Sequence, residues 1–361
     1  MTAILHVISG LGMGGAERNL IQLARALQGR GLPQYMACVG GDNVWSEELA
    51  AGGIGIKNLG VTSMLNAALG LTRLSSLIRR LKPAVVQGWM YHGDLFAALA
   101  HRITAGREGR RLFWSLRASD TDKGGYGRIV AVNARLSSWP DLVIANSKAG
   151  LDFHLTQGYR PRRAEVVPNG IDTEKFRPDA KARSEVRSEL GIAVDAVVAI
   201  HVARVDPMKD HATFLAAMRS LPHLHAVLAG AGTETLSLPK NVLALGLRRD
   251  IERWYAAADI VVSTSAYAEG FSNTIAEGMS SGLIPIASDI GDARDIVGDA
   301  GQVILPGGPE AVVQALKSVA ELPLPERQLR GERARQRICE RFSLGRTIEH
   351  YARLYAAAHS A

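Results

Sequence analysis

The fold is decided at the front of the chain, in residues 3–31, AILHVISGLGMGGAERNLIQLARALQGRG. A strand-like run, AILHVIS, leads into a glycine-rich turn, and the turn leads into a segment that is apolar at helical spacing. This pattern is one strand–turn–helix unit of an α/β protein. Gly10, Gly12 and Gly15 also match the G-x-G-x-x-G fingerprint, so dinucleotide binding has to be tested against the next strand.

That test fails, because the acid that should hold the ribose is missing. In the fingerprint an Asp or Glu follows the glycines by about 20 residues, at the end of the second strand. Here the second strand reads QYMACVGG, and the first acid after it is Asp42. We therefore expect no NAD. Gly14 and Gly15 lead straight into a helix, where free N–H groups attract an anion; the alternative is a merely tight turn.

Short β-branched runs alternate with amphipathic helices along the whole chain, which predicts parallel sheets covered by helices on both faces. At 361 residues the chain is long enough for two cores. We expect an α/β protein with two Rossmann-like domains whose parallel sheets face each other across a cleft. Residues 1–170, completed by a helix at about 345–361, form the first domain, and residues 171–344 form the second. The polar stretch 168–196 is interpreted as the linker between them, and movement is expected near 168–172 and 345–358.

Charge and cysteine content limit the class of protein. Residues 1–170 hold 20 Lys and Arg against 11 Asp and Glu, whereas the remainder holds 22 against 24. A basic first half suits anionic partners such as acidic lipid headgroups, or is only a solvated surface. No aromatic residues are interleaved with the basic clusters, so we expect no nucleic acid. Two isolated cysteines, no signal-peptide pattern and no long apolar run favour a cytoplasmic protein.

The densest chemical pattern lies in the second half. Arg204 and Lys209 follow the end of one predicted strand, on the loop that starts a helix. Two cations in such a place suit a diphosphate, because Arg offers a planar fork and Lys a compact charge. After another strand comes EGFSNTIAE, residues 269–277. Ser272 or Asn273 is a plausible N-cap, so a helix N-terminus lies beside Glu269.

Two carboxylates next to an anion site make sense if they bind sugar hydroxyls. Glu277 lies one helical turn after Asn273, on the same face. Cations and N–H groups would then hold phosphates, while Glu269 and Glu277 accept hydrogen bonds from hydroxyls. A nucleoside diphosphate sugar contains all of these parts.

These motifs resemble those of family-4 retaining glycosyltransferases with the GT-B fold. The matching pieces, in the expected order, are GGAER, VVPNGID, the R-x4-K pair at 204 and 209, the E-x7-E block at 269–277 and RFSLGRTIEHYARLY. They cover essentially the whole chain. WMYHGDL and WSLRASD are similar to segments of members that build bacterial surface polysaccharides or lipid-linked oligosaccharides.

The resemblance implies a role for each matching residue. Glu277 would bind the ribose and Glu269 the hydroxyls of the transferred sugar. Arg204 and Lys209 would hold the diphosphate. The backbone of the segment after Glu269 would assist them, and the first domain would add further donor contacts. These additional positions are Gly270, Phe271, Ser272 and Asn273 in the second domain, and Gly14, Gly15 and His92 in the first. Arg248 is a candidate for contact with the nucleobase.

The implied reaction moves a sugar from a nucleoside diphosphate sugar, most often UDP-linked, to a hydroxyl of a glycan or a polyprenyl-diphosphate-linked acceptor, with retention. No cofactor and no metal ion are expected, since Arg204, Lys209 and a helix N-terminus would stabilise the departing diphosphate. The segment Asp120-Thr121-Asp122 is a D-x-D triplet, which in other glycosyltransferases holds a divalent metal ion. It lies far in sequence from the diphosphate block, so we interpret it as a solvated loop or an acceptor contact.

Two other functions remain open from the sequence. A nucleotide-sugar 2-epimerase of the same fold would need no acceptor, and a non-catalytic protein would only bind the nucleotide sugar. Glu269, Glu277, Arg204 and Lys209 are all present, which favours an enzyme. Attachment of the basic domain to the inner face of the cell membrane is an additional expectation.

Overall fold

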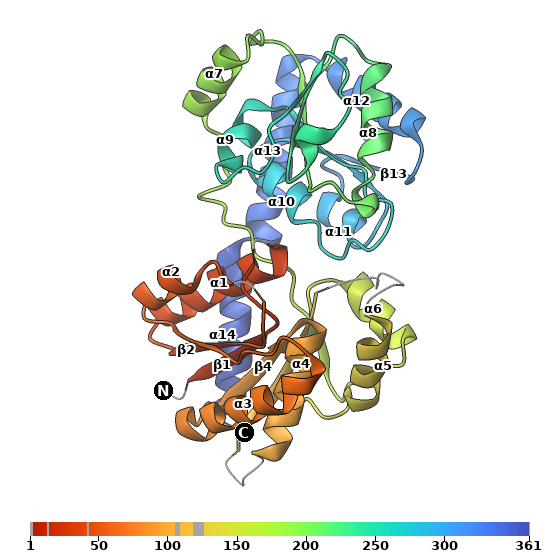
Figure 1. The fold of residues 1–361 in the computed structure, drawn as a ribbon. Helices are drawn as coiled ribbons and strands as arrows, with labels where there is room; N and C mark the ends of the chain where they lie inside the picture. Colours follow the sequence, from red (N-terminus) through yellow and green to blue (C-terminus); the bar gives the residue numbers. More distant parts are fainter. Residues whose placement is uncertain (1–2, 13, 42, 105–108, 118–125, 361) are drawn as a thin grey trace. The chain divides into compact units, whose positions relative to one another are not determined.

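The computed structural model describes residues 3–12, 14–41, 43–104, 109–117 and 126–360. The chain divides into two compact units, each with its own sheet (Figure 1). Unit 1 comprises residues 1–168 and 347–361, and unit 2 comprises residues 169–346. Both sheets are parallel throughout and carry helices, so the prediction of an α/β protein with two Rossmann-like domains is confirmed.

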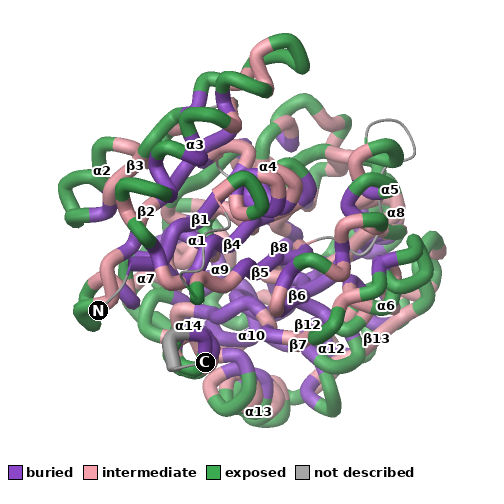
Figure 2. The backbone as a smooth tube through the Cα atoms, turned by 90° about the horizontal axis from the view of Figure 1, so that it is seen from below, coloured by how far each residue is buried: buried purple, intermediate pink, exposed green. Residues whose placement is uncertain are grey.

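The sheet of unit 1 has seven strands in the order β3-β2-β1-β4-β5-β6-β7. Its strands are β1 (Ile4–Ile8), β2 (Gln34–Cys38), β3 (Gly55–Asn58), β4 (Val85–Trp89), β5 (Arg111–Leu116), β6 (Leu142–Ala145) and β7 (Ala164–Val166). Its helices are α1 (Gly15–Gly29), α2 (Ser46–Ala51), the 3-10 turn η1 (Met64–Asn66), α3 (Ala67–Leu81), α4 (Met90–Ile103), α5 (Gly127–Leu136), α6 (Lys148–Thr156) and most of α14 (Leu344–Ser360). The central strands β1 and β4 are buried along their whole length (Figure 2).

The sheet of unit 2 has six strands in the order β10-β9-β8-β11-β12-β13. They are β8 (Val198–Val202), β9 (His225–Ala229), β10 (Val242–Ala244), β11 (Ile260–Ser263), β12 (Ile284–Ser288) and β13 (Gln302–Ile304). The helices are α7 (Ala180–Glu189), η2 (Pro207–Lys209), α8 (His211–Arg219), η3 (Thr233–Thr235), α9 (Ile251–Ala257), α10 (Asn273–Ser280), α11 (Ala293–Val297), α12 (Pro309–Ala320) and α13 (Leu324–Arg341).

Helix α14 brings the end of the chain back to the sheet of unit 1. The hydroxyl of Tyr355 donates to Gln87 on β4 at 2.5 Å, and Arg117 donates to the hydroxyl of Tyr351 at 2.6 Å. The ring of Tyr351 stacks on Trp89 with the centroids 6.4 Å apart. Polar bonds to buried strands therefore fix the helix in place, in addition to its apolar contacts.

The interpretation of residues 168–196 as a linker is wrong. Phe176 and Val186 are buried in the core of unit 2, and the Asp179 carboxylate caps α7 by accepting from the Ala182 N–H at 2.9 Å. The stretch is polar because only two residues of α7 are buried, Val186 and Arg187. The helix therefore shows only a weak hydrophobic periodicity in the sequence.

That arginine, Arg187, is the main polar anchor of α7. Its side chain is 3% exposed. The guanidinium donates to Asp259 at 2.8 Å and to the carbonyl oxygens of Ala257, Ala193, Val194 and Ala196 at 2.8 to 3.0 Å. Removing this guanidinium should lower the stability of the unit, because the buried carboxylate and carbonyl oxygens around it would lose their hydrogen-bond donor.

We expect Arg187→Met to lower the free energy of unfolding of unit 2 by about 3–5 kcal/mol, because it leaves the Asp259 carboxylate and several carbonyl oxygens under-bonded. Urea unfolding followed by hydrogen exchange of unit 2 peptides measures this. The matched control is Arg253→Gln, which breaks an exposed pair with Glu189 at 2.5 Å and should leave the free energy of unfolding close to that of the wild type. Equal losses in the two variants would contradict the assignment of Arg187 as an anchor.

Candidate functional site

The candidate site of unit 2 lies where the order of the strands reverses. Strands β8 and β11 are neighbours, and from this pair the sheet extends in opposite directions along the chain. Loops that leave the carboxyl ends of two such strands diverge, and ligands of open α/β sheets bind between them. Here the loop after β8 carries Arg204 and Lys209, and the loop after β11 carries Glu269.

An ion pair between Lys209 and Glu269 joins these two loops. The side chains are 19% and 15% exposed, so the pair is screened from water but still accessible. The Ser265 hydroxyl donates to the same Glu269 oxygen at 3.0 Å. The carboxylate is therefore oriented from two sides, and Lys209 is held at the edge of the sheet where the sequence predicts a diphosphate.

Both loops contain a residue with a strained backbone next to the paired side chains. Asp210 has φ +45° and Ala268 has φ +60°, and each directly adjoins a member of the ion pair. A non-glycine residue in this region costs of order 1–3 kcal/mol and persists only where the surrounding structure imposes it. The strain at these two positions marks the ion pair as a constrained feature of the unit.

A buried hydrogen-bond chain fixes the Lys209 loop from below. His201 on β8 is buried, and burial followed by the charges of His211 and Lys209 lowers its pKa well below the usual value, so the ring is neutral. Its Nε2 lies 3.1 Å from the Thr264 hydroxyl, which is within reach of the carbonyl oxygens of Lys209 and Asp210 at 3.1 and 2.9 Å. The hydroxyl donates to the carbonyls, so it accepts from a His201 ring that carries its proton on Nε2.

Arg204 lies on the same loop but does not join the ion pair. It is exposed, and its guanidinium forms two hydrogen bonds with Asp206 at 2.8 and 3.1 Å. Desolvation of the Asp206 carboxyl is outweighed by the Met208 N–H and by Arg204, so the pKa of Asp206 is lowered. Close packing of the next loop supports this one, since a Cβ at Gly230 would lie 2.1 Å from the Ala203 carbonyl oxygen.

Helix α10 starts at Asn273, directly beyond the Glu269 loop, with Ser272 as N-cap residue and no capping bond from its side chain. Phe271 is buried against Phe342 with the ring centroids 5.4 Å apart, and the Asn169 side chain donates to Asn273 at 2.9 Å. These contacts fix the helix start, whose first N–H groups have no partner within the helix and favour an anion.

Glu277 is 8% exposed and lies one turn further along α10, on the side of Asn273. The Tyr255 hydroxyl donates to its carboxylate at 3.4 Å. Gly270 precedes the helix and is packed against the loop after β12, because a Cβ at Gly291 would lie 2.4 Å from its carbonyl oxygen. Arg248 lies on the loop before α9, is exposed, and pairs with Asp250 while its guanidinium stacks 5.3 Å from the ring of Trp254.

Unit 1 has a matching arrangement, because its strand order reverses between β1 and β4. Gly14 is the N-cap residue of α1 and Gly15 its first residue, and an added Cβ at Gly14 would lie 2.3 Å from a carboxylate oxygen of Glu17. The Glu17 carboxylate therefore lies over the N-terminus of α1, where the helix dipole stabilises it. An anion that binds at this helix end has to compete with Glu17.

A pocket of about 810 Å³ lies at this edge of unit 1, and we call it the β1–β4 pocket. Gly10, Gly12 and His92 line it together with a mostly apolar wall. The wall residues are Val39, Val61, Met64, Leu95, Phe96, Ile129 and Val132. His92 lies on α4, two residues after Met90, whose φ of +61° is a further strained position, and desolvation lowers the pKa of the His92 ring. Its ring lies edge-on to Tyr126, with centroids 6.2 Å apart.

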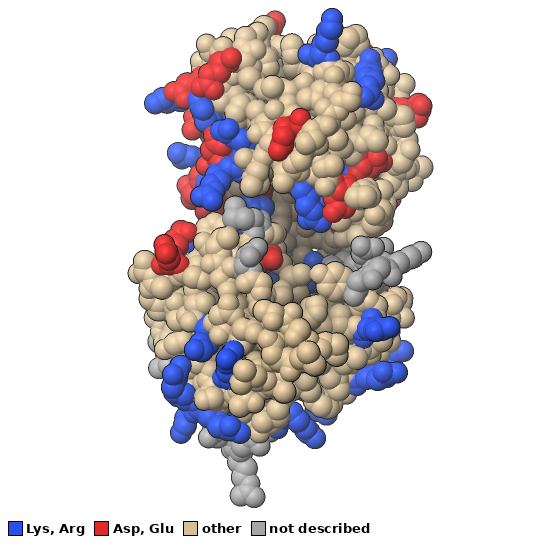
Figure 3. Space-filling model, viewed as in Figure 1, with Lys and Arg blue, Asp and Glu red and all other residues tan. Residues whose placement is uncertain are grey.

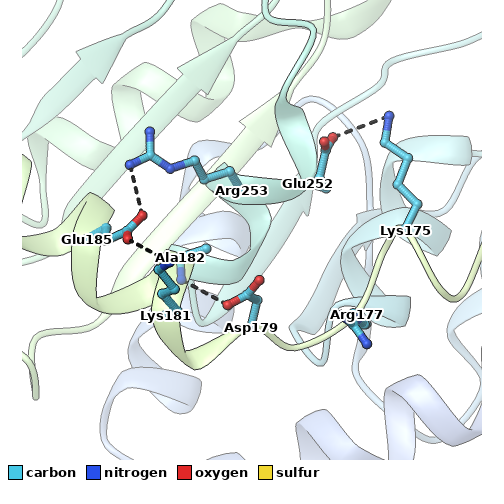
Figure 4. Close-up of a pocket in the computed structure, with 8 residues that line it drawn as sticks. All are labelled: Lys175, Arg177, Asp179, Lys181, Ala182, Glu185, Glu252 and Arg253. Carbon is cyan, nitrogen blue, oxygen red and sulfur yellow. Dashed lines mark hydrogen bonds and ion pairs between the residues drawn. The ribbon is translucent and has the colours of Figure 1, made fainter.

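A smaller hollow of about 320 Å³ in unit 2 is lined mainly by charged side chains (Figure 4). Lys175 pairs with Glu252 at 3.4 Å, and Glu185 lies 3.9 Å from Lys181 and 3.4 Å from Arg253. Three carboxylates, Asp179, Glu185 and Glu252, line the hollow against four cations, so most of its charge is paired within the protein and the excess is a single positive charge.

Within the part of the chain that the structure describes, no group of three or more His, Cys, Asp or Glu side chains could hold a metal ion. Asp120 and Asp122, the acids of the D-x-D triplet, lie outside the described residues, as does Asp42. None of the described helices is both long enough and apolar enough to cross a bilayer.

Sequence reasoning missed three residues that support the predicted site. Thr264 and Ser265 directly follow β11, so their position at the carboxyl end of a strand was a usable signal. His201 had no such signal, because it lies inside an apolar strand where a histidine is usually structural. Its role follows only from the bond to Thr264.

Comparison with known proteins identifies the family. The profile for Glycosyltransferase Family 4 matches residues 13–175, and that for Glycosyl transferases group 1 matches residues 196–321. A putative glycosyltransferase of Bacillus subtilis, EpsF, is 27% identical over 316 residues, covering 79% of each chain. A D-inositol 3-phosphate glycosyltransferase of Geodermatophilus obscurus is 32% identical over 228 residues, which cover 56% of this chain and 49% of that relative.

Solved structures agree on the fold. The crystal structure of HepE from Anabaena in complex with UDP superposes with a TM-score of 0.86 at 22% identity, covering 99% of this chain and 100% of the other. The chain therefore belongs to the family-4 glycosyltransferases and has their GT-B fold.

Proposed function

We propose that this glycosyltransferase takes its sugar from a nucleoside diphosphate sugar, most often UDP-linked, and passes it with retention to a hydroxyl of a glycan or lipid-linked glycan. The observation that carries the proposal is the Lys209–Glu269 ion pair at the strand-order reversal of unit 2, next to the start of α10. It combines a cation, a carboxylate and free N–H groups, which are the groups that a sugar diphosphate requires.

Each part of the donor has a proposed partner in unit 2. Lys209 and Arg204 hold the diphosphate, together with the backbone from Gly270 to Asn273. Glu269 accepts hydrogen bonds from the sugar, and Glu277 accepts them from the ribose. The choice of UDP is supported by the HepE crystals, which contain UDP, UDP with glucose, or UDP-glucose.

In the proposed reaction the bond between the anomeric carbon and the diphosphate oxygen breaks through an oxocarbenium-like transition state. Negative charge builds on the departing diphosphate, and Lys209 is already oriented to stabilise it. The acceptor oxygen bonds to the anomeric carbon on the face that the diphosphate leaves, and its proton passes to the departing oxygen. Configuration is then retained without a protein nucleophile, and we propose that no metal ion is required.

Unit 1 is proposed to bind the acceptor. Its β1–β4 pocket combines His92 and the glycine loop with an apolar wall, which suits a sugar attached to an apolar carrier. The excess of basic residues in this unit suits an anionic membrane surface as the place where such an acceptor is found. The roles of Gly14, Gly15, His92 and Arg248 toward the donor stay predictions.

Lys209→Ala should lower turnover at saturating donor by at least ~10²-fold, because a preorganised cation for the leaving group is lost, and Arg204→Ala should have a similar effect. Steady-state release of nucleoside diphosphate measures this. Lys240→Ala is the control, since Lys240 is exposed and precedes β10, at the opposite edge of the same sheet. Turnover near that of the wild type in Lys209→Ala would remove the diphosphate assignment.

Thr264→Val should lower turnover about tenfold, because Lys209 loses the hydroxyl that fixes its loop. In the Lys209→Ala background the same change should cost little more, since both act through one interaction. Thr156→Val removes a comparable hydroxyl bond on α6, to Phe153 at 2.6 Å, and should leave turnover unchanged. Additive losses in the double variant would mean that Thr264 acts on stability alone.

A panel of nucleotide sugars should single out one donor by thermal shift, since a ligand at about 100 times its Kd adds ~2.7 kcal/mol to the stability of the folded state. With that donor, transfer should continue at an unchanged rate in EDTA, because protein groups carry the charge of the diphosphate. An absolute requirement for a divalent ion would contradict the proposed mechanism without affecting the choice of donor.

A further inference from the structure

Unit 1 exposes two adjacent apolar side chains beside the β1–β4 pocket. Met64 is 95% exposed and Leu65 is 97% exposed, and both lie on the 3-10 turn η1 between β3 and α3. Isolated exposed apolar residues are common and need no explanation. Two consecutive ones at this exposure are different, because one of them, Met64, also lines the pocket.

The turn that presents them is built by one side chain, Asn66. Its Oδ1 accepts from the N–H groups of Thr62 and Ser63 at 3.2 and 3.1 Å. Its Nδ2 donates to the Gly60 carbonyl oxygen and to the Thr62 hydroxyl, both at 3.1 Å. The conformation that holds Met64 and Leu65 in solvent is therefore fixed before any partner arrives, which lowers the entropic cost of binding.

Helix α3 continues this surface with a face that carries only positive charge. Its buried side faces the core through Gly70, Leu74, Leu77 and Ile78. The exposed residues are Ala68, Leu69, Thr72, Arg73, Ser76, Arg79 and Arg80, and most of them recur at helical spacing. From residue 52 to residue 104 the sequence contains a single acid, Asp94, which is buried. Figure 3 shows Lys and Arg side chains gathered over the part of unit 1 where Figure 1 draws α3.

We propose that this surface, the docking face, binds unit 1 to an anionic lipid bilayer, with Met64 and Leu65 inserted among the headgroups. The docking face is defined as Met64, Leu65, Leu69, Arg73, Arg79 and Arg80. An amphipathic helix with cations on its polar side and apolar residues at one end has the chemistry of an interfacial anchor. The proposal rests on the proposed function in one respect, since a lipid-linked acceptor would then lie at the level of the pocket.

Charge decides between a bilayer and other occupants. A second copy of this chain in a symmetric contact would bring the arginines of one face against those of the other, which is unfavourable. Single-stranded nucleic acid binds on stacked aromatic rings, and the docking face contains none. Anionic headgroups complement the arginines, and the acyl boundary accepts the two apolar side chains.

The test is co-sedimentation of the full chain with phosphatidylcholine vesicles, with and without phosphatidylglycerol, at low and at high salt. Wild-type protein should bind the anionic vesicles at low salt and largely dissociate at high salt, since each arginine contributes about fivefold to partitioning. Met64→Ser/Leu65→Ser should lower partitioning at least ~10-fold, because apolar area is no longer buried. Arg79→Gln/Arg80→Gln should lower it about 25-fold on anionic vesicles only.

The matched control is Val194→Ser/Leu305→Ser, which removes two apolar side chains of unit 2 that are 84% and 75% exposed. It should sediment as the wild type does. The proposal is overturned if Met64→Ser/Leu65→Ser binds vesicles like the wild type, or if the control loses as much. It is also overturned if that pair of substitutions only converts a dimer into a monomer in sedimentation velocity.

Donor binding separates this proposal from the proposed function. The thermal shift caused by a nucleotide sugar should be the same in the wild type and in Met64→Ser/Leu65→Ser, because the docking face contains none of the residues proposed to bind the donor. If no nucleotide sugar shifts either protein, the proposed function fails while the vesicle result still stands.

Discussion

The ion pair between Lys209 and Glu269 is the constraint on which the candidate site depends. It joins the loops that leave β8 and β11, the two strands between which the order of the sheet reverses. Without it Lys209 would lose the carboxylate that holds it, although the Ser265 hydroxyl would still bond to Glu269. With it, the cation and the carboxylate are held at one edge of the sheet, and strained backbone at Asp210 and Ala268 accompanies the arrangement.

Preorganisation of this kind explains why an enzyme keeps a partly buried ion pair. A pair in such a position contributes little net stability, because desolvation offsets most of the attraction. In the proposed function its use is as a charge that needs no rearrangement when a leaving group becomes negative. The hydrogen bonds from His201 to Thr264 and from Thr264 to the Lys209 carbonyl also fix the Lys209 loop. These groups are neutral, so they add no charge next to the ion pair.

The sequence was sufficient for the family and the class of fold but not for the contacts within the units. The βα alternation predicts two parallel sheets because buried strands read as apolar runs. The short edge strands β3 and β13 contain no buried residue, so no such run marks them. Residues 168–196 read as a linker because Arg187 replaces part of an apolar face with buried hydrogen bonds.

The same limit applies to the site. Spacing places Lys209 and Glu269 after strands, but their ion pair depends on which strands are adjacent, and that is a property of the fold. The pairing of Arg204 with Asp206 likewise cannot be read from the R-x4-K motif, which suggests two cations acting as one. Local patterns therefore identify candidate residues, while topology determines which of them lie together.

Two glycines show how closely the loops are packed around the candidate site. At Gly291 φ is +63° and a Cβ would lie 2.0 Å from the Glu269 carbonyl oxygen, so the loop after β12 contacts the backbone of the site directly. At Gly230 the same close approach occurs against the loop that carries Arg204. Backbone therefore packs against the candidate site from both sides, and a side chain larger than hydrogen at Gly230 or Gly291 would displace the loops that carry Arg204 and Glu269.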